Sequence, residues 1–253
     1  MRPLPGAWRL ASAVRAPANA LASRLQLPLP LLVTVAACDG PQSILDPAGP
    51  AARDAALLWW PMLLVAVLSL LLVSVLWLLA LRRGPRGDEA EAKIVRRWLV
   101  GGGLLLPTVS LIALLAFGIP AGERMLLPGE PPPLRIEVTA RQWAWEVRYP
   151  ASGVVMVNRL HLPLGQPVEI HLESADVIHS FWVPRLGRKL DVIPGRRNVL
   201  RLQADHLGRL QGQCAEYCGR GHAHMRLAVE VHSGADFAAW LDRQAAATVV
   251  ARR

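Results

Sequence analysis

The sequence predicts a two-helix transmembrane hairpin followed by an all-β sandwich or barrel domain. Two uncharged apolar stretches, residues 57–81 and 98–119, are each longer than the roughly 20 residues that cross a bilayer as a helix. Beyond residue 134, apolar and polar side chains alternate with a period of two, as in half-buried strands. A basic segment separates the two apolar stretches, and a proline-rich segment precedes the alternating region.

The distribution of charge predicts the orientation in the membrane. Residues 82–97, between the two apolar stretches, carry six Lys or Arg, whereas residues 38–56 carry only Arg53. Because short cytoplasmic loops are enriched in Lys and Arg, the loop is predicted to be cytoplasmic and everything after residue 120 to lie outside. Of the net charge of +9, residues 121–253 supply only +4, from 17 basic and 13 acidic residues. The basic excess thus reflects membrane orientation and gives no support to nucleic-acid binding.

The N-terminus resembles a bacterial lipoprotein signal peptide. Residues 1–24 contain four arginines and no acid, and the apolar run LQLPLPLLVTVAA then leads into Cys38. We expect Cys38 to become the lipidated first residue of the mature chain; the alternative is cleavage elsewhere, with Cys38 an ordinary residue.

The predicted organisation is a signal peptide (1–37), an extracytoplasmic segment (38–56), helix 1 (57–81), a cytoplasmic loop (82–97), helix 2 (98–120), a linker (121–134) and a periplasmic β domain with a C-terminal helix (135–253).

Five stretches of the β domain alternate like strands and are separated by Pro, Gly, Asn or Asp. They are RIEVTARQWAWEVRY, VMVNRLHL, PVEIHLES, NVLRLQA and MRLAVEV. This number of short strands predicts a sandwich or barrel. The final stretch, residues 234–247, places Phe237, Trp240 and Leu241 at helical spacing, which predicts a packing face.

One loop gathers metal-binding side chains. CAEYCGRGHAHM, residues 214–225, contains two thiols, an imidazole and a thioether, a donor set that suits copper. A structural disulfide is one alternative, but it would close a short loop, where a cross-link stabilises least, and would leave His222 and Met225 unexplained. A Cys2His2 zinc site is another, although zinc has no use for Met225. The loop alone leaves these possibilities open.

A second segment carries a family resemblance. DVIHSFWVPRLGRKLDVIPGRRN, residues 176–198, together with the loop at 214–225, resembles the copper-binding subunit II of the haem-copper oxidases, to which cytochrome c oxidase belongs. The similarity covers most of residues 57–232 and implies a cupredoxin-like domain with a binuclear copper A centre. It implies that Cys214 and Cys218 bridge the two coppers. The remaining implied ligands are His179, His222, the Met225 thioether and the main-chain carbonyl of Glu216.

The resemblance implies further roles. Trp143, in RQWAW, matches the residue through which electrons enter, and Trp145 is expected on the same face of a strand. The Glu216 side chain matches a magnesium ligand at the boundary with subunit I, with a surface carboxylate as the alternative, and Asp191 matches an acid near that boundary. The other histidines are expected to be surface or packing residues: His161, His171, His206, His224 and His232.

The implied function is that of subunit II of a bacterial cytochrome c oxidase, an oxidoreductase and translocase embedded in the inner membrane. Such a chain accepts electrons from a c-type cytochrome and passes them to haem in subunit I, where oxygen is reduced to water and protons are pumped. It does not reduce oxygen itself, and subunit III is a further expected partner.

Three departures from the family qualify this interpretation. Val100 replaces the usual glutamate of helix 2, the external domain is net basic, and no CxxCH motif for a fused haem is present. The basic domain indicates a donor other than a basic cytochrome c, such as a membrane-bound cytochrome. Two alternative functions of the chain remain, a copper A subunit of a nitric oxide reductase and a membrane-tethered copper carrier. A quinol oxidase subunit is disfavoured because those relatives lack the ligands that are complete here.

Overall fold

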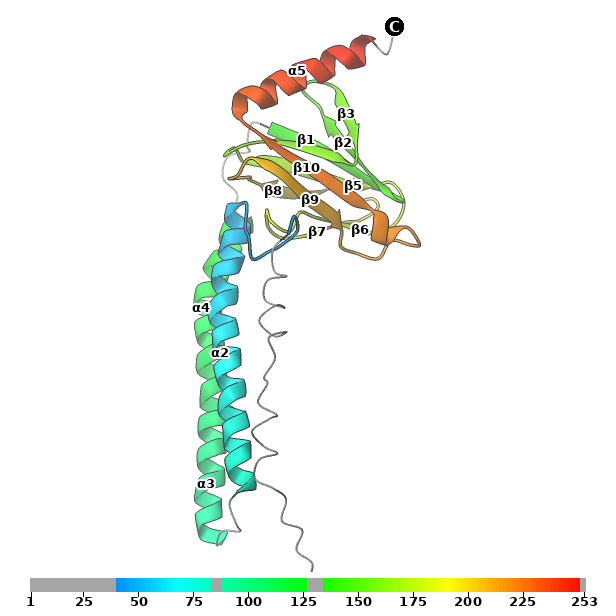
Figure 1. Ribbon diagram of the computed structural model, residues 1–253. Helices are drawn as coiled ribbons and strands as arrows, with labels where there is room; N and C mark the ends of the chain where they lie inside the picture. The colour runs from blue at the N-terminus through cyan, green and yellow to red at the C-terminus, as the bar shows by residue number, and fades with distance from the viewer. Residues whose placement is uncertain (1–39, 83–87, 127–133, 251–253) are drawn as a thin grey trace, which may run out of the picture. The chain divides into compact units, whose positions relative to one another are not determined.

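A computed structural model of the chain describes residues 40–82, 88–126 and 134–250 (Figure 1). The predicted signal peptide and Cys38 lie outside these residues, so both remain predictions. The described chain consists of a pair of long apolar helices, two β-sheets and a C-terminal helix.

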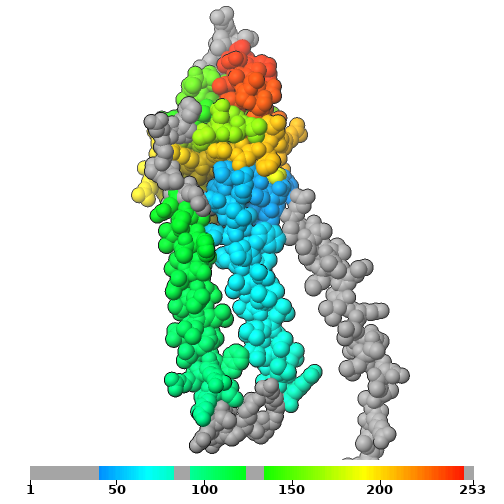
Figure 2. Space-filling model, turned by 90° about the vertical axis from the view of Figure 1, so that its left-hand side faces the viewer, coloured from blue at the N-terminus to red at the C-terminus, as the bar shows by residue number. Residues whose placement is uncertain are grey.

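The first long helix, α2, spans Pro50–Leu81, and the second consists of α3 (Asp88–Val100), a π-helical turn η4 (Gly101–Leu105) and α4 (Leu106–Leu126). Both are long and apolar enough to cross a membrane, and α2 and α4 lie side by side (Figures 1 and 2). The π turn ends two residues before Pro107, which has no N–H to donate to the carbonyl of Gly103. The wider turn therefore falls where a regular α-helical hydrogen bond is lost.

The helix α2 begins seven residues before the uncharged stretch at Leu57. Pro50 opens it, as suits a position whose N–H has no partner within the helix. Arg53 then pairs with Asp205 of the β domain at 2.7 Å. The first turns of α2 therefore contact the β domain. The uncharged stretch in the sequence marks only the later part of the helix, which is suited to lipid.

Residues 46–49 are held against the β domain by main-chain and side-chain contacts. The Ala48 N–H donates to the carbonyl of Arg185 at 2.7 Å, and the Ala48 carbonyl accepts from the Asp205 N–H at 2.8 Å. Ala48 is fully buried. A Cβ at Gly49 would lie 2.3 Å from the carbonyl oxygen of Gln203, so only glycine allows this close approach.

Two five-stranded sheets form the sandwich, in the orders β3-β2-β1-β5-β8 and β4-β10-β9-β6-β7. Pairs β1/β5 and β4/β10 are parallel, and the other paired strands are antiparallel. The first sheet contains β1 (Leu134–Arg141), β2 (Ala144–Tyr149), β3 (Val154–Val157), β5 (Val168–Ser174) and β8 (Asn198–Leu202). The second contains β4 (Arg159–Pro163), β10 (Arg226–His232), β9 (Gly208–Cys214), β6 (His179–Trp182) and β7 (Leu190–Val192). Their facing aliphatic and aromatic side chains form one core, so the predicted fold class, a helical hairpin with a cupredoxin-like sandwich, is confirmed.

Two of the predicted strands are in fact two strands each. The run from residue 135 to 149 turns back at Gln142 and Trp143, so β1 and β2 form an antiparallel hairpin. The run from 155 to 162 changes sheet at Asn158, which has a φ of 56°, a conformation that asparagine tolerates better than most residues. The turn also corrects the expectation for Trp145: this residue is fully buried, whereas Trp143 is 41% exposed.

The C-terminal helix α5 (Gly234–Val250) covers part of the sandwich, and Phe237 and Trp240 join the core. The predicted packing face is thereby confirmed. Trp240 packs edge-on against Tyr149, with ring centroids 5.3 Å apart.

Replacing Tyr149 by phenylalanine is expected to destabilise the sandwich. Its buried hydroxyl accepts from the main-chain N–H of His161 at 2.7 Å and donates to the carbonyl of the same residue at 2.9 Å. Without the hydroxyl, the main-chain N–H and carbonyl of His161, on the free edge of β4, lose their partner, which lowers the free energy of unfolding by about 1–3 kcal/mol. We expect thermal unfolding of the purified chain to begin several degrees lower, about 2–4 °C per kcal/mol. Tyr217→Phe, at a residue 73% exposed, is the matched control, and equal shifts in both variants would contradict the argument.

Candidate metal centre

The candidate centre lies where β6 and β9 meet the loop 215–225. His179 is the first residue of β6 and Cys214 the last of β9. The loop is closed by a hydrogen bond from the Cys214 N–H to the Met225 carbonyl at 2.9 Å, and the Ala215 N–H donates to the carbonyl of Ser180, also at 2.9 Å. These bonds fix the loop to β6, so residues distant in sequence are held at one end of the sheet.

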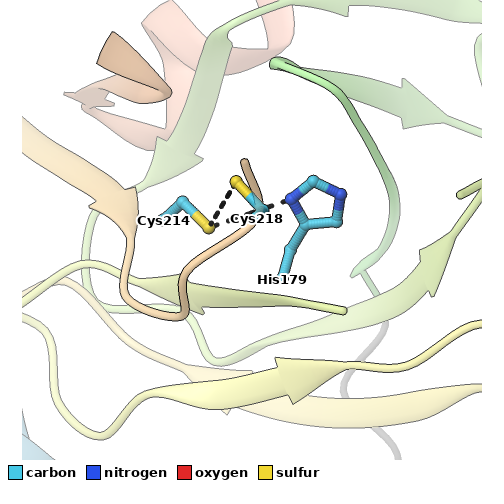
Figure 3. Close-up of side chains that lie close together, drawn as sticks. All are labelled: His179, Cys214 and Cys218. Carbon is cyan, nitrogen blue, oxygen red and sulfur yellow. Dashed lines mark hydrogen bonds between the residues drawn. The ribbon is translucent and has the colours of Figure 1, made fainter. Parts of the chain in front are cut away.

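Two sulfur atoms form the middle of the centre (Figure 3). The Sγ atoms of Cys214 and Cys218 are 3.7 Å apart, and both cysteines are free. His179 Nδ1 lies 3.8 Å from the Cys214 sulfur, and the carbonyl oxygen of Glu216 lies 3.1 Å from it. On the other side, His222 Nδ1 and Met225 Sδ lie 3.6 Å and 3.8 Å from the Cys218 sulfur. Each sulfur therefore has one imidazole and one further donor beside it.

This arrangement fits a pair of soft metal ions. Two thiolates at this separation can each bridge two ions, while the remaining donors divide into one pair for each ion. The metal-binding atoms of His179, Cys214 and Cys218 lie within 4.8 Å of one another, a cluster that does not include His222. A single tetrahedral zinc ion would leave Met225 unused, although this thioether is buried against Cys218.

The electrostatics of the thiols agree with a cation at this place. Burial, together with the neighbouring Cys214 thiol, raises the pKa of the Cys218 thiol to about 12. The Cys218 thiol is therefore protonated near neutral pH when no cation is present, and a metal ion that replaces its proton supplies the missing positive charge.

Asp176 supports the centre from outside. Its carboxylate accepts hydrogen bonds from His179 Nε2 at 2.8 Å, from the Val177 N–H at 2.6 Å and from the Gln142 N–H at 2.6 Å. Burial opposes ionisation of Asp176, but these hydrogen bonds outweigh it and hold the pKa below its ordinary value. With its Nε2 proton committed to Asp176, His179 presents the lone pair of Nδ1 to the sulfur cluster.

Trp143 connects the centre to the protein surface. Its indole Nε1–H donates to the carbonyl of Cys218 at 3.2 Å, and the Gln142 side chain donates to the same oxygen at 2.8 Å. The indole ring lies directly over Gly221, where an added Cβ would come within 2.3–2.7 Å of three ring carbons. The glycine thus allows a half-exposed ring to contact the loop main chain.

The two remaining predicted side chains are those of Glu216 and Asp191. Only the main-chain carbonyl of Glu216 faces the cluster, and its side chain is exposed. Asp191 lies on β7 opposite Ser180, the residue after His179, and its side chain is half-buried.

Sequence reasoning did not identify Asp176, Gln142 or Gly221 as parts of the centre. The position of Asp176, three residues before His179, was the available signal, because a nearby carboxylate often orients a metal-binding histidine. The sequence also contains no sign that His161 and His232 meet, whereas the structure brings their ring nitrogens within hydrogen-bonding distance, at 2.8 Å.

The chain is similar to known oxidase subunits. Residues 151–232 match the family model described as the periplasmic domain of cytochrome c oxidase subunit II. Cytochrome c oxidase subunit 2 of Alkalihalophilus pseudofirmus is 30% identical over 234 residues, which cover 87% of this chain and 68% of that protein. Quinol oxidase subunit 2 of Bacillus cereus is 29% identical over 227 residues, covering 85% and 77%. The solved periplasmic domain of cytochrome oxidase subunit II of Bradyrhizobium japonicum is 32% identical, covers 46% of this chain and 95% of that one, and has a TM-score of 0.44.

Proposed function

The chain belongs to the cytochrome c oxidase subunit II family, and from that premise we propose that it is the electron-accepting subunit of a bacterial cytochrome c oxidase. In this proposal it takes electrons from a c-type cytochrome at a copper A centre and passes them to haem in subunit I, where oxygen is reduced to water and protons are pumped. The observation that carries the proposal is the convergence of four further donor atoms on the sulfur pair of Cys214 and Cys218.

The general part of this assignment, the kind of complex and the kind of membrane protein, follows from family membership. The chain is a component of an oxidoreductase complex and a membrane protein with an extracytoplasmic domain. We place it in the bacterial inner membrane, with subunit I and subunit III as partners. Mature chains that begin at Cys38, measured by intact mass, would support its lipidation, and any other first residue would refute it.

The protein's own residues would hold the centre in one geometry. A pair of coppers, which the Cys214 and Cys218 thiolates would hold, would supply one-electron chemistry when bound. Asp176 fixes the orientation of His179, and the main-chain hydrogen bond from the Cys214 N–H to the Met225 carbonyl closes the loop. A ligand set that is held rigidly in both oxidation states needs little rearrangement, which favours fast electron transfer.

Trp143 is the proposed point at which electrons enter, because it is exposed on one side and donates a hydrogen bond to Cys218 on the other. The proposed magnesium role of the Glu216 side chain is compatible with its exposure in the isolated chain. Asp191 is the proposed acid at the same boundary. The net positive charge of residues 121–253 leads us to propose a donor that does not depend on an extensive acidic docking face.

The test is copper stoichiometry combined with electron paramagnetic resonance. The full chain, purified in detergent, is loaded with copper and partly oxidised. We expect two coppers per chain that share one unpaired electron. One copper per chain, or a spectrum of a localised Cu(II), would refute the proposal and favour a copper carrier. The catalytic subunit that co-purifies with the chain separates an oxidase from a nitric oxide reductase.

A further inference from the structure

A second group of metal-binding side chains lies on the outer face of the sandwich. His161 of β4 and His232 of β10 face each other, with Nδ1 of the first 2.8 Å from Nε2 of the second. With the carboxylate of Glu230, their donor atoms lie within 4.8 Å of one another. None of these three residues belongs to the sulfur cluster, so the group is independent of the proposed function.

The strand register explains why these residues meet. β4 and β10 run parallel, and His161 pairs with Glu230 while His232 pairs with Pro163, two residues further along both strands. Because alternate residues of a strand point to the same face, Glu230 and His232 project on the side of His161.

The main chain and the ring of His161 are both held in place. The Tyr149 hydroxyl bonds to its N–H and carbonyl, and its imidazole stacks on Trp240 of α5, with centroids 4.0 Å apart and planes inclined by 16°. His161 as a whole residue is 6% exposed. A donor whose position is fixed before a ligand arrives loses little conformational freedom on binding.

We propose that His161, Glu230 and His232 form a binding site for a divalent transition metal of the zinc class. Two imidazoles and one carboxylate are a set of three protein ligands that zinc commonly uses, with a fourth position left open. The absence of sulfur among these three donors distinguishes the site from the thiolate centre and disfavours Cu(I). An ion here would link the edge strand β4 to β10 beneath α5.

The charge state of the group suits this role. Among the described residues, the Glu230 side chain makes no ion pair, so its charge is available to an ion.

Space for a fourth ligand lies beside the group. A cavity of about 360 Å³ is lined by His161 and Glu230 together with Arg159 and Arg209. It can admit the water molecule that completes a tetrahedral zinc site. The two guanidinium groups add positive charge near the cavity, so a small anion is the alternative fourth ligand.

The experiment is a zinc titration of the full, copper-loaded chain in detergent, followed by calorimetry. We expect one zinc ion to bind per chain. Glu230→Gln and His232→Gln, at half-buried positions, should each weaken binding by at least about tenfold, since even outer-shell changes cost 10–100-fold in metal affinity. His206→Gln, at an exposed histidine outside the group, is the matched control and should bind zinc as the unaltered chain does.

Cobalt(II), used in place of zinc, identifies the ligands. Binding at His161, Glu230 and His232 should produce only weak visible bands, whereas binding to Cys214 and Cys218 would produce intense near-ultraviolet bands from sulfur. The proposal is overturned if no zinc binds, if Glu230→Gln and His232→Gln bind it normally, if His206→Gln weakens it equally, or if cobalt shows the sulfur bands. Unchanged unfolding midpoints of the metal-free variants would show that they remain folded. Failure of copper loading would be seen separately, as a low copper content.

Discussion

Cys218→Ser is expected to eliminate the copper pair and, with it, electron transfer from cytochrome to oxygen. The Cys218 sulfur lies within 3.8 Å of three other donors, those of Cys214, His222 and Met225, so it is central to the arrangement. A serine hydroxyl is shorter, is not ionised near neutral pH and is a harder ligand than copper prefers. We expect turnover below about 1% of the unaltered oxidase, which corresponds to about 2.7 kcal/mol or more of activation free energy.

Copper content and steady-state oxidation of cytochrome by the assembled oxidase provide the measurement. Ser180→Ala is the matched control, because Ser180 is equally buried, adjoins His179 and has a hydroxyl without a hydrogen-bond partner among the described residues. It should keep its copper and its turnover. A Cys218→Ser oxidase that retained two coppers and normal turnover would show that the thiol pair does not hold the centre.

The apolar helices and the loop ligands could be predicted because their signals are local. An uncharged stretch of sufficient length is enough to indicate a membrane span, and four side chains of the centre lie between Cys214 and Met225. His179 lies 35 residues earlier, so spacing alone could not connect it to the loop. Its assignment came from the resemblance, and in the structure β6 brings it beside Cys214.

The alternation of apolar and polar residues did not reveal a strand end where the turn contains residues that also suit a strand. Trp143 lies in the turn between β1 and β2, yet it continues the pattern of aromatic residues around it. The strands β6 and β7 have only four and three residues, too few for a period of two to stand out. The meeting of His161 and His232 depends on parallel pairing between β4 and β10, and such non-local register leaves no local pattern.

Displacing the Trp143 indole is expected to slow electron uptake from the cytochrome while leaving the copper centre intact. Gly221→Ala would place a Cβ within 2.3 Å of the ring, so the indole must move away from the loop. Trp143→Phe keeps an aromatic ring but removes the hydrogen bond to the Cys218 carbonyl. Because both changes break the contact between surface and centre, each should reduce the rate of uptake by at least about tenfold, or about 1.4 kcal/mol.

Rapid mixing of the oxidised chain with reduced cytochrome measures this rate, and reduction by a small molecule shows whether the centre itself is unchanged. Gly234→Ala, where an added Cβ meets nothing within 4 Å, controls for the loss of a glycine and should leave both rates unaltered. If Gly221→Ala and Trp143→Phe take up electrons from cytochrome at the normal rate, electrons enter elsewhere. If reduction by cytochrome and reduction by the small molecule slow equally, the indole supports the loop that holds the copper ligands, and its role is structural. Slow uptake from cytochrome alone is the result that would identify Trp143 as the residue through which electrons pass to Cys218.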